Sequence, residues 1–130
     1  MRVLLDTHTF IWWDADKKPG RLSPKAFDVL SDSSNSLVVS LATIWEIQIK
    51  VQLGKLKLPS PLTDILNQQQ QANGIELFPV NVMHILALDT LPHHHRDPFD
   101  RILVAQAKVE NIPLVSKDSV FTQYSIPVLW

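Results

Sequence analysis

The chain has 130 residues, enough for one domain with a sizeable core but too few for two. Hydrophobic residues make up 45% and charged residues 19%, which excludes a disordered chain, and the absence of cysteine excludes disulfides and thiolate metal sites. The net charge of -1 provides no global positive field, so any attraction of nucleic acid must come from local Lys and Arg or from a bound metal.

No stretch of the sequence approaches the roughly 18 to 20 apolar residues that span a bilayer. The start of the chain resembles a signal peptide, but Asp6 and Asp14 interrupt its apolar run and no small-residue cleavage site follows. We therefore expect no membrane association and a cytoplasmic location, which the lack of cysteine also fits.

Short apolar runs alternate with helix-like stretches in the first half of the chain. The predicted elements are a strand over 2–6, a helix over 7–14, a helix over 24–31 capped by Ser23, a strand over 36–40 and a helix over 43–53. In the last of these, Ile44, Ile47, Val51 and also Trp45 are expected to face inward.

The second half continues the alternation. It predicts a helix from the Ser60-Pro61 cap through the glutamine run at 68–71, a strand over 75–78, a helix over 81–91, a helix over 97–110, a strand over 112–116, a short helix over 119–123 and a strand over 128–129. The whole pattern indicates a single doubly wound α/β domain over 1–130, with a central, mostly parallel sheet of about five short strands and helices on both faces.

The four tryptophans are interpreted as core residues. Two of them, Trp12 and Trp13, are also considered together with Phe10 for a homodimer interface or for a groove that binds a partner protein. Large apolar side chains mark such surfaces when they are exposed.

Four acidic residues follow apolar runs or lie on the helices after them: Asp6, Glu46, Asp100 and Asp118. Open α/β sheets bind ligands at the carboxyl ends of their parallel strands. A carboxylate is costly to desolvate beside a core unless it is paired or holds a metal. Four carboxylates that converge on this edge therefore favour a divalent-cation site.

Each of these acids also has a structural explanation. Asp6 and Asp118 are suited to cap the helices that follow them. Glu46 has Lys50 four residues later, the favourable order for a helix ion pair worth roughly 0.3 to 0.5 kcal/mol. Independent caps have no reason to share one edge, however, and so the set favours the cation site.

The segment Asp-Pro-Phe-Asp at 97–100 resembles a capping box. Asp97 is best explained as the helix cap. Asp100 lies in the first turn of the same helix, where the helix dipole stabilises an anion, and can direct an ionised carboxylate at a metal.

The five histidines are not predicted to bind metal or to act as a base. His93, His94 and His95 are adjacent, whereas ligating histidines usually show helical or wider spacing. His8 is interpreted as a packed or edge residue.

Four short motifs occur in order along the chain. They are Leu-Leu-Asp-Thr-His at 4–8, Trp-Glu at 45–46, Asp-Pro-Phe-Asp-Arg at 97–101 running into an apolar helix, and Val-Ser-Lys-Asp at 115–118. The ordered set resembles the PIN-domain family over the whole chain. The Asp-Pro-Phe-Asp-Arg version is similar to a bacterial subgroup related to the VapC-type toxins of toxin–antitoxin pairs.

The resemblance implies a nuclease that uses Mg²⁺ or Mn²⁺ to hydrolyse RNA phosphodiester bonds. Position by position, Asp6, Glu46, Asp100 and Asp118 match the family's four acids. Ser116 stands where the family often has a hydroxyl residue that supports the first acid, and Asp97 is treated as accessory. The resemblance also implies a small antitoxin protein that blocks the active-site groove.

Residue chemistry agrees with these expectations. Hard carboxylate oxygens suit Mg²⁺, and a second ion about 4 Å away is compatible with phosphodiester hydrolysis. We expect Asp6, Asp100 and Asp118 to hold the metal, with Glu46 bound to it directly or through water. Contacts to RNA phosphates are assigned to three basic residues: Arg96, Arg101 and Lys117.

Two alternatives stay open at this point. One is a catalytically inactive PIN-like module that binds RNA or protein, with the acids serving as caps. The other is a phosphotransfer domain with Asp6 as nucleophile, although the second aspartate that usually follows two positions later is absent, because that position is His8.

Overall fold

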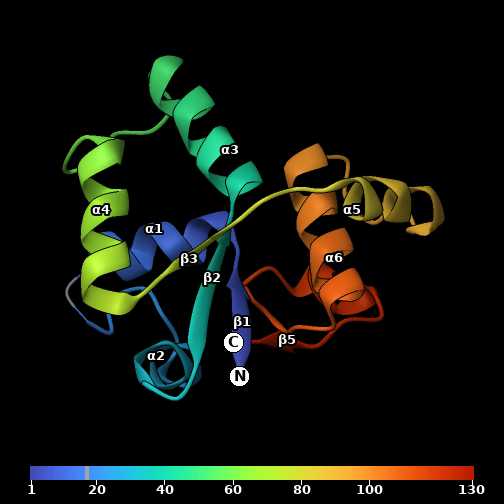
Figure 1. Cartoon of the computed structure of the whole chain (residues 1–130), viewed down its shortest axis with the longest axis horizontal. Coiled ribbons are helices and arrows are strands. Elements are labelled where there is room, and N and C mark those ends of the chain that lie inside the picture. Colours follow the sequence, from blue (N-terminus) through green and yellow to red (C-terminus); the bar gives the residue numbers. More distant parts are fainter. Residues whose placement is uncertain (17) are drawn as a thin grey trace.

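Five parallel strands form one sheet in the computed structural model, which describes residues 1–16 and 18–130. The strands are β1 (Arg2–Leu5), β2 (Ser36–Ser40), β3 (Glu76–Phe78), β4 (Leu114–Val115) and β5 (Val128–Leu129). Their order is β3-β2-β1-β4-β5, and every neighbouring pair is parallel. The strand order reverses at β1, so the sheet is doubly wound, as the sequence predicts (Figure 1).

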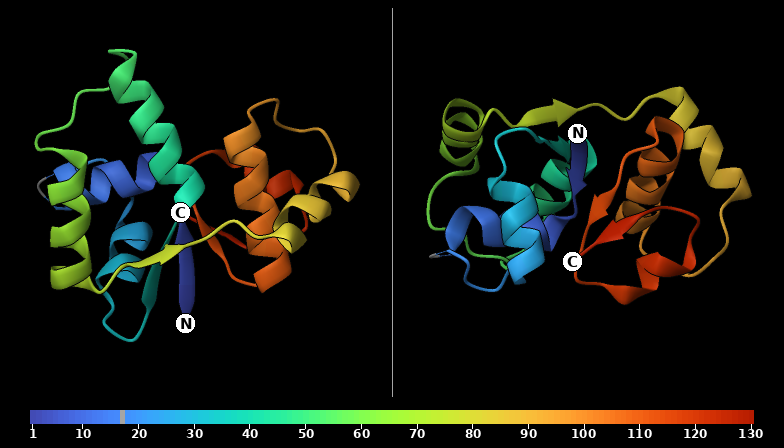
Figure 2. Two further views of the ribbon diagram at one scale, coloured as in Figure 1. Left: turned by 45° about the horizontal axis from the view of Figure 1, so that its top comes forward. Right: turned by 90° about the horizontal axis from the view of Figure 1, so that it is seen from below.

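Helices cover both faces of this sheet. They are α1 (Thr7–Ala15), α2 (Pro24–Ser31), α3 (Leu41–Gln52), α4 (Leu62–Asn73), α5 (Val82–Ala87) and α6 (Pro98–Glu110), with two 3-10 turns, η1 (Leu88–Thr90) and η2 (Ser119–Gln123). Figure 1 and the two views of Figure 2 place α1, α2 and α4 on one side of the sheet and α5 and α6 on the other. Among the described residues, no helix is long and apolar enough to cross a membrane.

Alternate strand residues supply two separate cores. Leu4, Val38 and Leu114 face α6 and pack with Leu103 and Phe121. The strand residues next to these point to the other face of the sheet, towards α1, α2 and α4. This second core contains Val3, Leu5, Leu37, Val39 and Val115. Because strand side chains alternate between faces, continuous apolar runs are what a sheet buried on both sides requires.

Helix starts agree closely with the predicted caps. The Ser23 hydroxyl accepts a hydrogen bond from Ala26 N–H, and Pro24 is the first residue of α2. The predicted cap at Ser60 is wrong, because Pro61 is the N-cap of α4 and no side chain caps that helix. Gln69, in the glutamine run, is buried and donates to Asp14 over 2.9 Å.

The placement of several apolar residues differs from the prediction. Trp45 is 64% exposed and contacts Phe99 edge to face, so the assignment of all four tryptophans to the core is wrong. Phe10 and Trp13 are buried, which removes them from the expected interface.

Helix α5 turns its apolar residues outward. Val82, Met83, Ile85 and Leu86 are exposed, whereas His84 is fully buried and bonds Glu110. The polar residue is the buried one because it pairs with Glu110 of α6.

An outward-facing apolar surface lies over α3, α5 and α6. It surrounds a cavity of about 600 Å³ that is lined by Leu41, Trp45, Ile85, Leu88, Phe99 and Ile102, among others. We refer to it as the Trp45 groove.

Candidate functional site

The register of the sheet brings two site segments side by side. Leu5 is paired with Val115, so Asp6 and Ser116 follow at the carboxyl ends of the neighbouring strands β1 and β4. The Ser116 hydroxyl donates to Asp6 Oδ2 over 2.5 Å and accepts from Asp118 N–H over 3.0 Å. Ser116 therefore links the first and fourth predicted acids.

Asp6 and Asp118 each use one carboxylate oxygen to cap a helix. Asp6 Oδ1 accepts from Thr9 N–H at the start of α1, and Asp118 Oδ1 accepts from Val120 N–H at the start of η2. The other oxygen of each contacts a second site residue: Asp6 Oδ2 contacts Ser116, and Asp118 Oδ2 lies 3.0 Å from His95 Nε2. Capping and a place in the site are thus compatible in one residue.

Glu46 is buried near the middle of α3. Its carboxylate accepts from the Thr7 hydroxyl over 2.6 Å and pairs with Lys50 Nζ over 2.6 Å. The ion pair predicted from the i, i+4 spacing is therefore present. It neutralises a carboxylate whose side chain is only 7% exposed. The hydrogen-bond partner of this carboxylate, Thr7, follows Asp6 directly in the sequence.

The start of α6 contributes Asp97 and Asp100. Asp97 caps the helix and accepts from the backbone N–H groups of Phe99 and Asp100. Burial raises the pKa of Asp100 to about 6, helped by the negative charge of Asp97 and opposed by His95.

Weaker contributions to the same pKa come from Glu46 and Asp6. Asp100 therefore lies within electrostatic reach of both acids, although the three belong to different elements. These carboxylates repel one another, and a bound divalent cation would reduce that repulsion.

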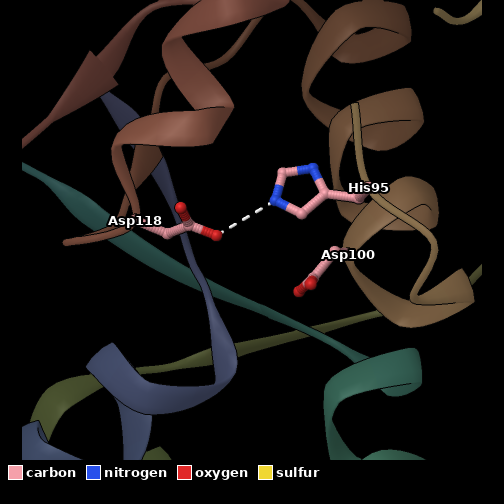
Figure 3. Close-up of side chains that lie close together, drawn as sticks. All are labelled: His95, Asp100 and Asp118. Carbon is pink, nitrogen blue, oxygen red and sulfur yellow. Dashed lines mark hydrogen bonds and ion pairs between the residues drawn. The ribbon is translucent and has the colours of Figure 1, made fainter. Parts of the chain in front are cut away.

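His95 is the site residue that the sequence interpretation missed. His95 Nε2, an Asp100 carboxylate oxygen and an Asp118 carboxylate oxygen all lie within 4.8 Å of one another (Figure 3). The sequence interpretation, which gave the 93–95 run no metal role, did not foresee this placement of His95. No signal in the sequence marks it, because its partners Asp118 and Tyr124 are 23 and 29 residues away.

Histidine contacts also set the ionisation of Asp118. Burial raises the pKa of Asp118, but the hydrogen bonds from His95 and Val120 N–H and the charges of His95 and His8 outweigh it, so the pKa lies below its usual value. His8 itself is exposed and stacks on Trp12.

The three basic residues assigned to RNA differ in their surroundings. Arg96 and Lys117 are exposed beside Asp97 and Asp118. The Arg101 guanidinium donates to the backbone carbonyl of Pro92 over 2.8 Å, and a second bond of 3.4 Å reaches the carbonyl of Leu88. Arg101 thus holds the loop before α6, and its contact with RNA remains a prediction.

The donor set fits a divalent cation. Oxygens of Asp100 and Asp118 and one nitrogen of His95 lie together in one group. Hydroxyl groups fix two further acids, Ser116 on Asp6 and Thr7 on Glu46. Divalent first-row metals and Mg²⁺ bind such oxygen-rich sites, and the hydrogen-bonded support of ligating carboxylates is a usual feature of them.

Similarity to known proteins extends over most of the chain. The model of the PIN domain family matches residues 3–127. Ribonuclease VapC22 of Mycobacterium tuberculosis is 29% identical over 117 residues, which cover 89% of this chain and 86% of that protein.

Two solved structures show the same fold. A chain of VapBC2 from Rickettsia felis, bound to a DNA fragment from its promoter, superposes with a TM-score of 0.73 at 14% identity and covers 98% of this chain and 97% of its own. A chain of FitAcB from Neisseria gonorrhoeae gives 0.65 at 16% identity, with coverage of 97% and 95%.

Proposed function

The chain belongs to the PIN domain family, and from this premise we propose that it is a ribonuclease that depends on a divalent metal and hydrolyses RNA phosphodiester bonds. The observation that carries the proposal is the linkage of Asp6, through Ser116, to Asp118, which faces His95 and Asp100. Similarity to ribonuclease VapC22 supports RNA as the substrate.

Asp6, Asp100 and Asp118 would hold Mg²⁺ or Mn²⁺, and Glu46 would bind it directly or through water. The bound ion would polarise the scissile phosphate and lower the pKa of the attacking water. Asp97 stays accessory, since its carboxylate is committed to the cap of α6.

The residues around the acids orient them before substrate arrives. Ser116 and Thr7 each donate to one carboxylate, which fixes the rotamers of Asp6 and Glu46. Lys50 offsets part of the negative charge that would otherwise repel RNA. Arg96 and Lys117, both exposed beside site acids, are the proposed contacts to backbone phosphates, with Arg101 as a third candidate.

We further propose that the protein is the toxin of a type II toxin–antitoxin pair and acts in the cytoplasm. Structures with the same fold include a toxin–antitoxin complex from Klebsiella pneumoniae, with a TM-score of 0.59, and VapBC-5 of M. tuberculosis, with 0.58. The proposed partner is a small antitoxin protein. Co-expression with the product of the adjacent gene, followed by co-purification and loss of RNA cleavage, tests this part.

Cleavage of RNA by the purified protein tests the enzymatic proposal. Activity is expected in Mg²⁺ or Mn²⁺, none in chelator, and a loss of at least about 100-fold in Asp6→Asn and in Asp100→Asn. Asp64→Asn, an exposed acid on α4, is the matched control and should keep full activity.

The same assay separates the alternatives. Cleavage that survives both substitutions or persists in chelator contradicts the mechanism. RNA binding without cleavage under any metal supports the inactive binding module, and a trapped phosphate on Asp6 supports phosphotransfer.

A further inference from the structure

The geometry points to His95 as a nitrogen ligand of the metal, a role that goes beyond the four acids and rests on the proposed function. The resulting His-Asp-Asp set, His95 with Asp100 and Asp118, gives the site a preference for first-row transition ions such as Mn²⁺ over Mg²⁺.

The His95 ring is held in one orientation. It packs against Phe121, with ring centroids 4.5 Å apart, and against Tyr124, to which it is parallel within 7° at 5.6 Å. Its side chain is only 9% exposed. A ring packed in this way has lost its rotamer freedom on folding, so binding a ligand to it carries little further entropic cost.

Tyr124 is placed to stabilise the tautomer that ligation requires, in which a cation takes the place of the Nε2 proton that otherwise bonds Asp118. Its hydroxyl lies 3.1 Å from His95 Nδ1 and 3.0 Å from the His95 backbone N–H. A phenol oxygen can accept both hydrogen bonds. With the proton on Nδ1 and directed at Tyr124, the lone pair on Nε2 is free, which is the arrangement usual for metal-bound histidine.

Nε2 then faces acceptors on the acids. It lies 3.0 Å from Asp118 Oδ2, and both atoms lie within 4.8 Å of an Asp100 oxygen (Figure 3). Two ligand atoms about 2.1 Å from one ion and at right angles to each other are about 3.0 Å apart. The spacing of Nε2 and Oδ2 is thus compatible with two ligands of one cation as well as with the hydrogen bond between them.

The chemical type of the ligand atoms decides which cation the site binds more tightly. Mg²⁺ takes hard oxygen ligands and keeps several waters, so an imidazole adds little to its binding. First-row transition ions accept imidazole readily. A role of His95 as hydrogen-bond donor alone would instead orient Asp118 for every divalent ion equally.

Pulsed EPR of Mn²⁺ bound to the full chain, without RNA, tests the inference. We expect ¹⁴N modulation from one imidazole, replaced by the ¹⁵N pattern after labelling of histidine. His95→Gln, which keeps a side-chain donor for Asp118, should abolish the modulation. It should also lower Mn²⁺ affinity by about tenfold or more, whereas Mg²⁺ affinity, measured by competition, should change less than about threefold.

Two variants serve as controls. His93→Gln, in the same exposed loop, and His8→Gln, beside Asp118, should both keep the modulation. Bound Mn²⁺ without nitrogen modulation, equal losses of Mn²⁺ and Mg²⁺ affinity in His95→Gln, or a signal that depends on His8 would each overturn the inference. Those outcomes leave the ribonuclease proposal intact, because that proposal is tested separately by RNA cleavage and by the Asp6→Asn variant.

Discussion

Ser116 donates a hydrogen bond of 2.5 Å to Asp6 across the join between β4 and β1. The two residues are 110 positions apart in sequence, and both are buried. One hydroxyl thereby fixes the first acid and, by accepting from the Asp118 backbone N–H, the start of η2.

Ser116→Ala should therefore weaken both fold and site. The change leaves the Asp6 carboxylate and the Asp118 N–H without this partner, at a cost of about 1 to 3 kcal/mol in the free energy of unfolding. RNA cleavage should fall about tenfold or more through misorientation of Asp6. Urea unfolding and a cleavage assay measure the two effects. Ser119→Ala, at an exposed serine of η2, is the control, and equal behaviour of the two variants would contradict the role assigned to Ser116.

Asp100→Asn should stabilise the protein that is free of metal. The folded-state pKa of Asp100, about 6, exceeds the ordinary 3.8, so the folded state binds more protons than the unfolded state between about pH 4 and 6. Stability contributed by protonated Asp100 is thus lost as the pH rises through this window. At about pH 7.5 in chelator the variant should be more stable by about 1 kcal/mol after allowance for solvent screening.

Thermal or urea unfolding across pH checks this prediction. The advantage of Asp100→Asn should vanish below about pH 4, where both proteins carry a neutral group, and Asp64→Asn should show no such pattern. A variant that is less stable than the parent chain at neutral pH would show that Asp100 is not held in an unfavourable field.

Lys50→Met should reveal the charge balance around Glu46. The substitution leaves a buried carboxylate without its 2.6 Å partner and should cost about 1 kcal/mol in chelator, since Lys50 itself is partly exposed. Added Mg²⁺ should shrink the loss, because a cation in the site offsets the same charge. Unfolding measured with and without Mg²⁺ tests both statements. Lys55→Met, the control, should show neither effect. A loss of stability that Mg²⁺ does not change would show that Glu46 does not interact with the bound metal.

The Trp45 groove is the surface on which we expect two copies of the chain to associate. Exposed apolar patches that surround a cavity of this size mark protein interfaces. Trp45→Glu should convert a dimer at micromolar concentration to a monomer in sedimentation experiments. Leu53→Glu, an exposed apolar position at the end of α3, is the control. A parent chain that sediments as a monomer at these concentrations would exclude the proposed homodimer.

Much of the fold follows from local patterns in the chain. The runs at 36–40 and 128–129 match β2 and β5, and the Asp-Pro pair at 97–98 marks the first residues of α6. These features are predictable because continuous apolar runs and cap residues act over a few neighbouring positions.

Orientation and long-range pairing were not predictable in this way. Helical spacing shows that α5 has an apolar side but not that His84, held by Glu110, would take the buried position. Trp45 lies outside the core for a similar reason, since its partner Phe99 belongs to α6. His95 is part of the site because it contacts Asp118 and Tyr124, and these contacts form only when the sheet is assembled.

The central position of β1 has a consequence for synthesis on the ribosome. β1 is made first, yet one of its two neighbours is β4, whose residues, with Asp118 and Tyr124 after them, are translated last among the site segments. Because a nascent chain emerges from its N-terminus, Asp6 lacks its partner Ser116 until the β4 segment has been translated. The proposed metal site is therefore incomplete while the segments before β4 are being made.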